Sequence, residues 1–299
     1  MTTYDFIAAN KRKTVILIAV FSALVLAIGW TIDQYYGGGG FFVGVAAIYS
    51  TISALVSYYA GDKVALAVSG ARPVTGAESP YVVRMVENLA ISQGMPTPKV
   101  YLIEDEAINA FATGRDPKHA SIAVTTGAVR KLANEELEGV LAHEMSHVKN
   151  YDIRVMTIVI VLVGIISVLA NMMFRATFYG GRRRDNRNSA SGVFLLIGLV
   201  LMIFAPFIAQ LIKLAVSRRR EYLADASGAL MTRFPEGLAR ALRKIQQESM
   251  PMAHASAATA HLFIANPFTG KTLEGLFSTH PPIEMRIAAL EKMASVPGT

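Results

Sequence analysis

The sequence contains no cysteine, which excludes disulfide bridges and thiolate ligands for a metal ion. It is also poor in charge, because Asp, Glu, Lys and Arg make up only 17% of its 299 residues, against about 25% in a soluble domain. Hydrophobic residues make up 53%, and the mean hydropathy is +0.39. We therefore expect part of the chain to lie in lipid, and any metal site to use histidine and carboxylate ligands.

Long, nearly uncharged segments indicate where the chain enters the lipid. Four apolar runs cover residues 14–32, 41–60, 155–174 and 193–217, each close to the ~20 residues of a membrane-spanning helix. The first run is longer than the core of a signal peptide and lacks a following cleavage site of small residues, so we interpret it as a retained anchor. The runs hold almost no ionisable residue apart from Lys213 near one end, which argues against a transporter. The sequence predicts an integral membrane protein with about four hydrophobic helices.

Basic residues predict the orientation of the first two runs. Three of them, at 11–13, precede the first run, none lies in the loop at 33–40, and several follow the second run. Because basic loops stay on the cytoplasmic side, we expect the N-terminus and residues 61–154 in the cytoplasm. The net charge of +7 is explained by Lys and Arg at helix ends, which fix the orientation of a membrane protein on an anionic lipid surface. We therefore expect no nucleic-acid partner.

The second hydrophobic hairpin, residues 155–217, conflicts with this rule. Its loop contains five arginines and a single acid, and this basic loop would lie outside the cytoplasm if both runs cross the membrane. Either the hairpin is re-entrant, or it inserts after the first pair of helices has fixed the orientation. Both alternatives return the chain to the cytoplasmic side.

The segments outside the hairpins have the patterns of a mixed domain. Helical periodicity covers 79–93, and short strands are expected at 99–104, 109–114 and 120–125. These patterns predict a mostly helical α+β fold. The expected division is a transmembrane hairpin at 1–60, a soluble domain built from 61–154 and 218–299, and the second hairpin at 155–217 between its halves, with further helices at 236–247 and 282–295.

The segment His143-Glu144-Met145-Ser146-His147 carries the clearest chemical signal. On a helix, positions i and i+4 share a face, so His143 and His147 can present ring nitrogens to one metal ion, for which zinc is the expected element. Glu144 can hold a water molecule at the metal and take its proton. The acids of 134–138 precede this segment, as is typical of the start of a helix.

A catalytic zinc needs a third protein ligand, and it must come from a separate element. Glu221 and Asp225 are the candidates, because they lie four residues apart on one helical face just after the fourth apolar run. One can bind the metal while the other accepts a hydrogen bond from a ligand imidazole. The alternative is that Glu221 pairs with Arg218 or Arg220 and Asp225 is solvated.

These motifs, in this order, resemble the membrane zinc protease family of HtpX and the CAAX prenyl proteases. The resemblance covers nearly the whole chain, from the two N-terminal runs to Arg286. The matching segments are Asn109-Ala-Phe-Ala, His143-Glu-Met-Ser-His147, Arg220-Glu-Tyr-Leu-Ala-Asp225 and Ser278-Thr-His-Pro-Pro282.

The resemblance implies roles for individual residues. It implies a zincin-like (gluzincin) domain in which Glu221 is the third zinc ligand and Asp225 orients a ligand histidine. It also implies that Asn109 and Ala110 begin an edge strand along which a substrate backbone lies. Strand addition suits a protease that acts on many sequences, because it binds the backbone rather than side chains. The alternative interpretation is that Asn109 simply starts a turn.

Three further residues have two interpretations each. His280 either stabilises the oxyanion of the tetrahedral intermediate or is a packing histidine that holds the C-terminal segment. Arg286 either contacts the substrate or forms an ion pair with Glu284 or another nearby acid. Asp152 either supports the metal site or pairs with Arg154.

Together, these features predict a zinc-dependent endopeptidase of the bacterial inner membrane, with one Zn2+ per chain and its active site facing the cytoplasm. The resemblance implies that its substrates are misfolded or surplus membrane proteins, within envelope quality control. Its partners would then be membrane proteins or unfolded polypeptides and the lipid bilayer. The alternative is a non-catalytic zinc-binding scaffold or holdase. However, structural zinc sites usually have four Cys or His ligands, and a scaffold does not need Glu144.

Overall fold

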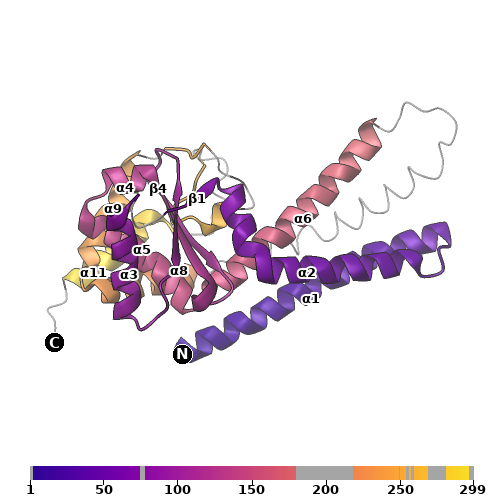
Figure 1. Ribbon diagram of the computed structural model, residues 1–299, viewed down its shortest axis with the longest axis horizontal. Helices are drawn as coiled ribbons and strands as arrows, with labels where there is room; N and C mark the ends of the chain where they lie inside the picture. The colour runs from indigo at the N-terminus through magenta and orange to yellow at the C-terminus, as the bar shows by residue number, and fades with distance from the viewer. Residues whose placement is uncertain are drawn as a thin grey trace.

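A computed structural model gives the arrangement of the chain (Figure 1). The predicted fourth apolar run, the arginine-rich loop from residue 180 onward and His280 lie outside the residues that the structure describes. Those residues are 3–74, 78–179, 218–248, 250–253, 256, 259–268 and 281–295.

An N-terminal helical hairpin extends from the mixed domain (Figure 1). It consists of α1 (Thr3–Tyr36) and α2 (Phe41–Val68), and within the described ranges these are the two helices long and apolar enough to cross a membrane. The backbone N–H groups of Gly40 and Phe42 donate to the Asp33 carboxylate at 2.5 and 3.0 Å, which fixes the turn between the helices. The first two predicted runs are therefore confirmed as helices, although α2 continues beyond residue 60.

Helix α6 (Asp152–Tyr179) leaves the domain on the same side as the hairpin (Figure 1). It contains the third predicted run, and its first turns pack against α1 and α2. Whether this run spans the membrane stays a prediction. The buried contact between the three helices is formed by Leu17, Phe21, Val25, Ala46, Val155, Ile158, Val159 and Leu162.

A four-stranded sheet forms the centre of the mixed domain, in the order β1-β2-β4-β3. Strand β2 is parallel to β4, whereas β1 and β3 are antiparallel to their neighbours, so β3 is an edge strand. The three predicted strands are confirmed to within one residue at each end. The short β1 was not predicted, because three residues that include a proline give no alternating pattern. The bounds are β1 Ala71–Pro73, β2 Lys99–Ile103, β3 Ala110–Gly114 and β4 Ala120–Thr125.

Helices pack on this sheet around the larger of two apolar clusters that include sheet residues, here called the core, which confirms the mostly helical α+β fold. The core joins one face of α3 to the sheet, to the helix of the HExxH motif (α5) and to the C-terminal helices. The helices are α3 (Pro80–Ser92), α4 (Thr126–Lys131), α5 (Asn134–Lys149), α8 (Arg218–Thr232), α9 (Pro235–Glu248) and α11 (Ile283–Ala294), with 3-10 turns at Pro117–His119 and Ala260–Leu262.

Helix α5 approaches α9 so closely that only glycine fits at position 139. A Cβ atom there would lie 2.7 Å from the backbone nitrogen of Leu238, and backbone cannot move aside cheaply. We expect Gly139→Ala to lower the free energy of unfolding by about 1–3 kcal/mol, although alanine is the better helix former. Gly44→Ala in α2 is the control, since a Cβ there meets no atom within 4 Å. Equal thermal midpoints in detergent for the two variants would contradict this packing.

Candidate metal centre

Helix α5 places the two histidines of the motif side by side and inside the protein. Glu136 caps the helix by accepting from the backbone N–H of Ala133 at 2.8 Å, and the helix then runs unbroken through His143 and His147. Both histidines are buried, and their Nε2 atoms are 3.3 Å apart. Two tetrahedral zinc ligands at ~2.0–2.1 Å from the metal would be separated by nearly the same distance.

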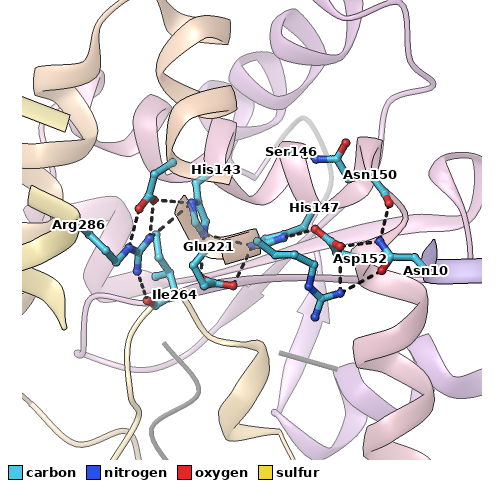
Figure 2. Close-up of polar contacts among 11 residues, drawn as sticks. Asn10, His143, Ser146, His147, Asn150, Asp152, Glu221, Ile264 and Arg286 are labelled. Carbon is cyan, nitrogen blue, oxygen red and sulfur yellow. Dashed lines mark hydrogen bonds and ion pairs between the residues drawn. The ribbon is translucent and has the colours of Figure 1, made fainter. Parts of the chain in front are cut away.

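Helix α8 supplies a carboxylate to the same point (Figure 2). The carboxylate oxygens of Glu221 lie 3.8 Å from His143 Nε2 and 3.7 Å from His147 Nε2. The three ligand atoms all lie within 4.8 Å of one another. The absence of a side chain at Gly228 permits this approach, because a Cβ there would be 3.0 Å from the His143 backbone nitrogen.

Asp225 and Arg286 hold the far side of the His143 ring. Asp225 Oδ1 lies 2.9 Å from His143 Nδ1, so the ring presents Nε2 toward Glu221. Arg286 is 1% exposed and donates to both carboxylate oxygens of Asp225, at 2.7 and 2.9 Å. Burial would raise the pKa of Asp225, but Arg286 and His143 outweigh it and keep this pKa well below its usual range. Arg286 therefore pairs with Asp225 rather than with Glu284.

Asp152 holds the His147 ring in the same way. Its Oδ2 atom lies 3.0 Å from His147 Nδ1. The contact requires a sharp break between α5 and α6, and Tyr151 makes it with a left-handed backbone (φ 59°). Burial would lower the pKa of His147, but the bond to Asp152 and the nearby Glu221 outweigh it and raise the pKa to about 9. The structure therefore supports the interpretation that Asp152 supports the metal site, rather than a pair with Arg154.

Glu144 is 1% exposed and adjoins the cluster. Its Oε1 atom has no hydrogen-bond partner, which is costly for a buried carboxylate unless a ligand or water completes the site. The backbone N–H of Ala112, on the edge strand β3, acts on the same carboxylate and lowers its pKa. Burial raises the pKa of Glu144, against the opposing effect of His143 and His147, and a base with a raised pKa is suited to accept a proton near neutral pH.

The chemistry of the donor set fits a metal ion. Each imidazole is held at Nδ1 by a carboxylate and turns Nε2 toward a common point, the usual arrangement of histidine ligands. One carboxylate completes three ligands, and Glu144 stands beside them with an unsatisfied oxygen. Three ligands with a neighbouring acid match a catalytic site that keeps one position for water.

Comparison with known proteins agrees with this geometry. Residues 77–294 match the sequence profile of peptidase family M48. The chain belongs to that family. It is similar to a "Protease HtpX homolog" of Dictyoglomus thermophilum, at 46% identity over 98% of this chain and 95% of the relative. A protein of the same name from Thermoanaerobacter pseudethanolicus is also 46% identical, over 98% of both chains.

A solved structure has a fold similar to that of this M48 chain. The crystal structure of S. mikatae Ste24p aligns with 96% of this chain and 67% of its own length, at a TM-score of 0.53 and 18% identity. This likeness concerns the fold alone. It includes the hydrophobic hairpin as well as the M48 domain, because the aligned share exceeds residues 77–294.

The expected substrate residues of this M48 protein already contact another part of the chain. Asn109 is buried; its Nδ2 donates to the Ala265 carbonyl at 3.1 Å, and its Oδ1 accepts from the Ala265 N–H at 3.3 Å. The Ala110 carbonyl accepts from the Ile264 N–H at 3.0 Å. A substrate strand at this end of β3 would have to replace these bonds, and the substrate role of Asn109 and Ala110 stays a prediction.

Other histidines and some unpredicted residues complete the description. His119 lies at the surface beside Asp116, at 2.7 Å, and His261 is a buried residue 3.2 Å from the Met156 carbonyl, so neither joins the metal cluster. His280 lies outside the described residues. The sequence analysis missed Asn10, which contacts Asp152 from α1. A single asparagine before the basic residues 11–13 gives no signal of such a contact.

Proposed function

We propose that the protein is a membrane-anchored, zinc-dependent endopeptidase. The observation that carries the proposal is the convergence of His143, His147 and Glu221 beside the unsatisfied carboxylate of Glu144, in a member of a peptidase family. Three nitrogen and oxygen ligands without cysteine suit zinc, which binds such sets in metalloproteases. We place this domain in the gluzincin class, with Glu221 as the third ligand.

The residues divide the work of peptide hydrolysis. Zinc, when bound, polarises the scissile carbonyl and lowers the pKa of water from 15.7 toward about 7. Glu144 accepts the proton of the attacking water and passes it to the leaving amine. Asp225 and Asp152 bind Nδ1 of the two rings, which turns each Nε2 toward the point where zinc would replace its proton, and Arg286 balances the charge of Asp225.

We propose misfolded or surplus membrane proteins as substrates, in quality control of the bacterial inner membrane. The two apolar helices of the hairpin support this proposal, because a protease tethered to a bilayer meets membrane-bound chains at a raised effective concentration. The basic residues at 11–13, in α1 just before its apolar stretch, favour an active site on the cytoplasmic side. We propose about four hydrophobic helices in all, with the segment 155–217 as a second hairpin that either crosses the membrane or is re-entrant.

The second candidate function is a non-catalytic scaffold with a structural zinc. Its ligand set would resemble the present one, so metal binding alone does not separate the two functions. Glu144 favours the protease, since a buried carboxylate with an unsatisfied oxygen costs stability and serves no structural bond at that atom.

The experiment compares one unfolded test segment in two forms, soluble and fused to a membrane anchor. The purified protein is reconstituted in vesicles, treated with a chelator, and resupplied with zinc. We expect cleavage only with zinc, and cleavage of the anchored form about 10²-fold faster at equal total concentration. Glu144→Gln at equal metal content is the control. No cleavage of either form at full zinc occupancy would favour the scaffold.

A further inference from the structure

A residue of the first membrane helix reaches the metal centre. Asn10, on α1, is 2% exposed, and its Nδ2 donates to Asp152 Oδ1 at 2.7 Å. The other oxygen of the same carboxylate, Oδ2, lies 3.0 Å from His147 Nδ1. Asn10 therefore contacts Asp152, which in turn contacts the candidate metal ligand His147 (Figure 2). Asn10 itself lies outside residues 77–294, which match the family.

The amide is chemically suited to this position because it both donates and accepts. While Nδ2 donates to Asp152, Oδ1 accepts from the Arg220 guanidinium at 3.3 Å, and Arg220 itself donates to Asp152 Oδ1 at 3.1 Å. An aspartate at position 10 would place a second carboxylate beside Asp152, and an alanine would leave buried polar groups without their partner.

Asn10 also fixes the turn that brings Asp152 to His147. Its Nδ2 donates to the Asn150 carbonyl at 3.0 Å, at the C-terminal end of α5. The next residue, Tyr151, has the left-handed backbone that reverses the chain into α6. Asn10 therefore contacts both ends of the break between α5 and α6, on which the position of the Asp152 carboxylate depends.

We propose that Asn10 is a positioning residue, through which the membrane helix α1 holds Asp152 and thereby orients His147 for metal binding. The inference rests on the proposed function in so far as the metal is taken to be zinc. It implies that the membrane hairpin is part of the metal centre as well as an anchor. Arg220, next to Glu221 in α8, links the same group to the element that supplies the third ligand.

The rival explanation is that Asn10 only docks α1 onto the domain. Thr14 provides the matched control, since it is a buried polar residue one turn further along α1, and its hydroxyl bonds to the Asn10 carbonyl rather than to Asp152. A docking role predicts similar effects of Asn10→Ala and Thr14→Ala. A positioning role predicts an effect on metal affinity for Asn10→Ala alone.

The test measures zinc affinity of the full-length protein in detergent, by competition with a chromophoric chelator. We expect Asn10→Ala and Asn10→Asp to weaken zinc binding about 10- to 100-fold, and Thr14→Ala to leave it within about threefold. The two substitutions at position 10 also protect the test against a variant that fails to fold. The double mutant tests the route of the effect. In a protein that carries Asp152→Asn, adding Asn10→Ala should change the logarithm of zinc affinity by less than about a third of the change that it causes in the wild type. The reason is that Asp152, which transmits the effect of Asn10 to His147, has already been altered.

Unchanged affinity in both position-10 variants would overturn the inference, as would equal losses for Asn10→Ala and Thr14→Ala. The outcome for the proposed function is read separately, from cleavage by the wild-type protein. Cleavage with no dependence of affinity on Asn10 overturns only the positioning role. Weakened affinity in a protein that cleaves nothing overturns only the protease.

Discussion

Glu144→Gln is expected to lower the rate of peptide-bond hydrolysis by about 10²–10⁴-fold while the metal content stays at the wild-type level. Glutamine keeps the size of the side chain but cannot take a proton from water at neutral pH. The proposed metal ligands remain, since His143, His147 and Glu221 would hold the ion without the Glu144 carboxylate. The measurement is the initial rate of cleavage of an unfolded test protein at matched zinc occupancy.

The stability of the same variant provides an independent check. Glu144 is buried, its Oε1 atom has no partner, and burial raises its pKa, so the metal-free protein carries a cost for this carboxylate. We expect the thermal midpoint of metal-free Glu144→Gln to equal or exceed that of the wild type. A variant that folds, binds zinc and cleaves within threefold of the wild-type rate would contradict the role of Glu144 as the base.

The local part of the site follows from the sequence, because its geometry is that of a helix. His143 and His147 share a face of α5 at a spacing of four, and Glu221 and Asp225 do the same on α8. Which of the two acids faces the metal required the resemblance to the family. The structure places Glu221 between the histidines and Asp225 behind His143.

Arg286→Leu is expected to cost about 3–5 kcal/mol in the free energy of unfolding, the largest stability effect that we predict. The substitution leaves the buried Asp225 carboxylate without the two bonds that compensate its charge, and the Ile264 carbonyl without the bond from Arg286 Nη1 at 3.0 Å. The measurement is unfolding in detergent by denaturant, with the free energy compared at equal protein and detergent concentrations. Arg286→Lys should recover only part of the loss, since an ammonium group does not match a carboxylate with two parallel bonds.

The control for this prediction is Arg243→Gln, which removes an ion pair between α9 and α11. Arg243 and Glu291 are 43% and 48% exposed, and ion pairs at such positions contribute less than about 1 kcal/mol. If Arg286→Leu were no more destabilising than Arg243→Gln, the buried pair with Asp225 would not exist in the folded protein.

Contacts between distant elements could not be predicted from the sequence. Arg286 has an acid two residues away at Glu284, so a local ion pair was as good an interpretation as the observed contact with Asp225 on another helix. The contact of Asn10 with Asp152 could not be predicted either, because a polar residue in the first turns of a membrane helix is common and has no periodic pattern. The engagement of Asn109 by Ala265 likewise depends on a loop whose path has no sequence pattern. The longer helices and the three longer strands could be predicted, since each has its own pattern of apolar residues, whereas the six-residue α4 was too short to give one.

The most direct test of the metal centre is the metal content of the purified wild-type protein, Glu221→Ala and Glu144→Gln, determined by elemental analysis after equilibration with zinc and removal of excess metal. We expect about one zinc per chain in the wild type and in Glu144→Gln, and well under a tenth of that in Glu221→Ala, because a catalytic site with three protein ligands does not retain zinc with two. Equal zinc content in all three proteins would contradict a centre built from His143, His147 and Glu221.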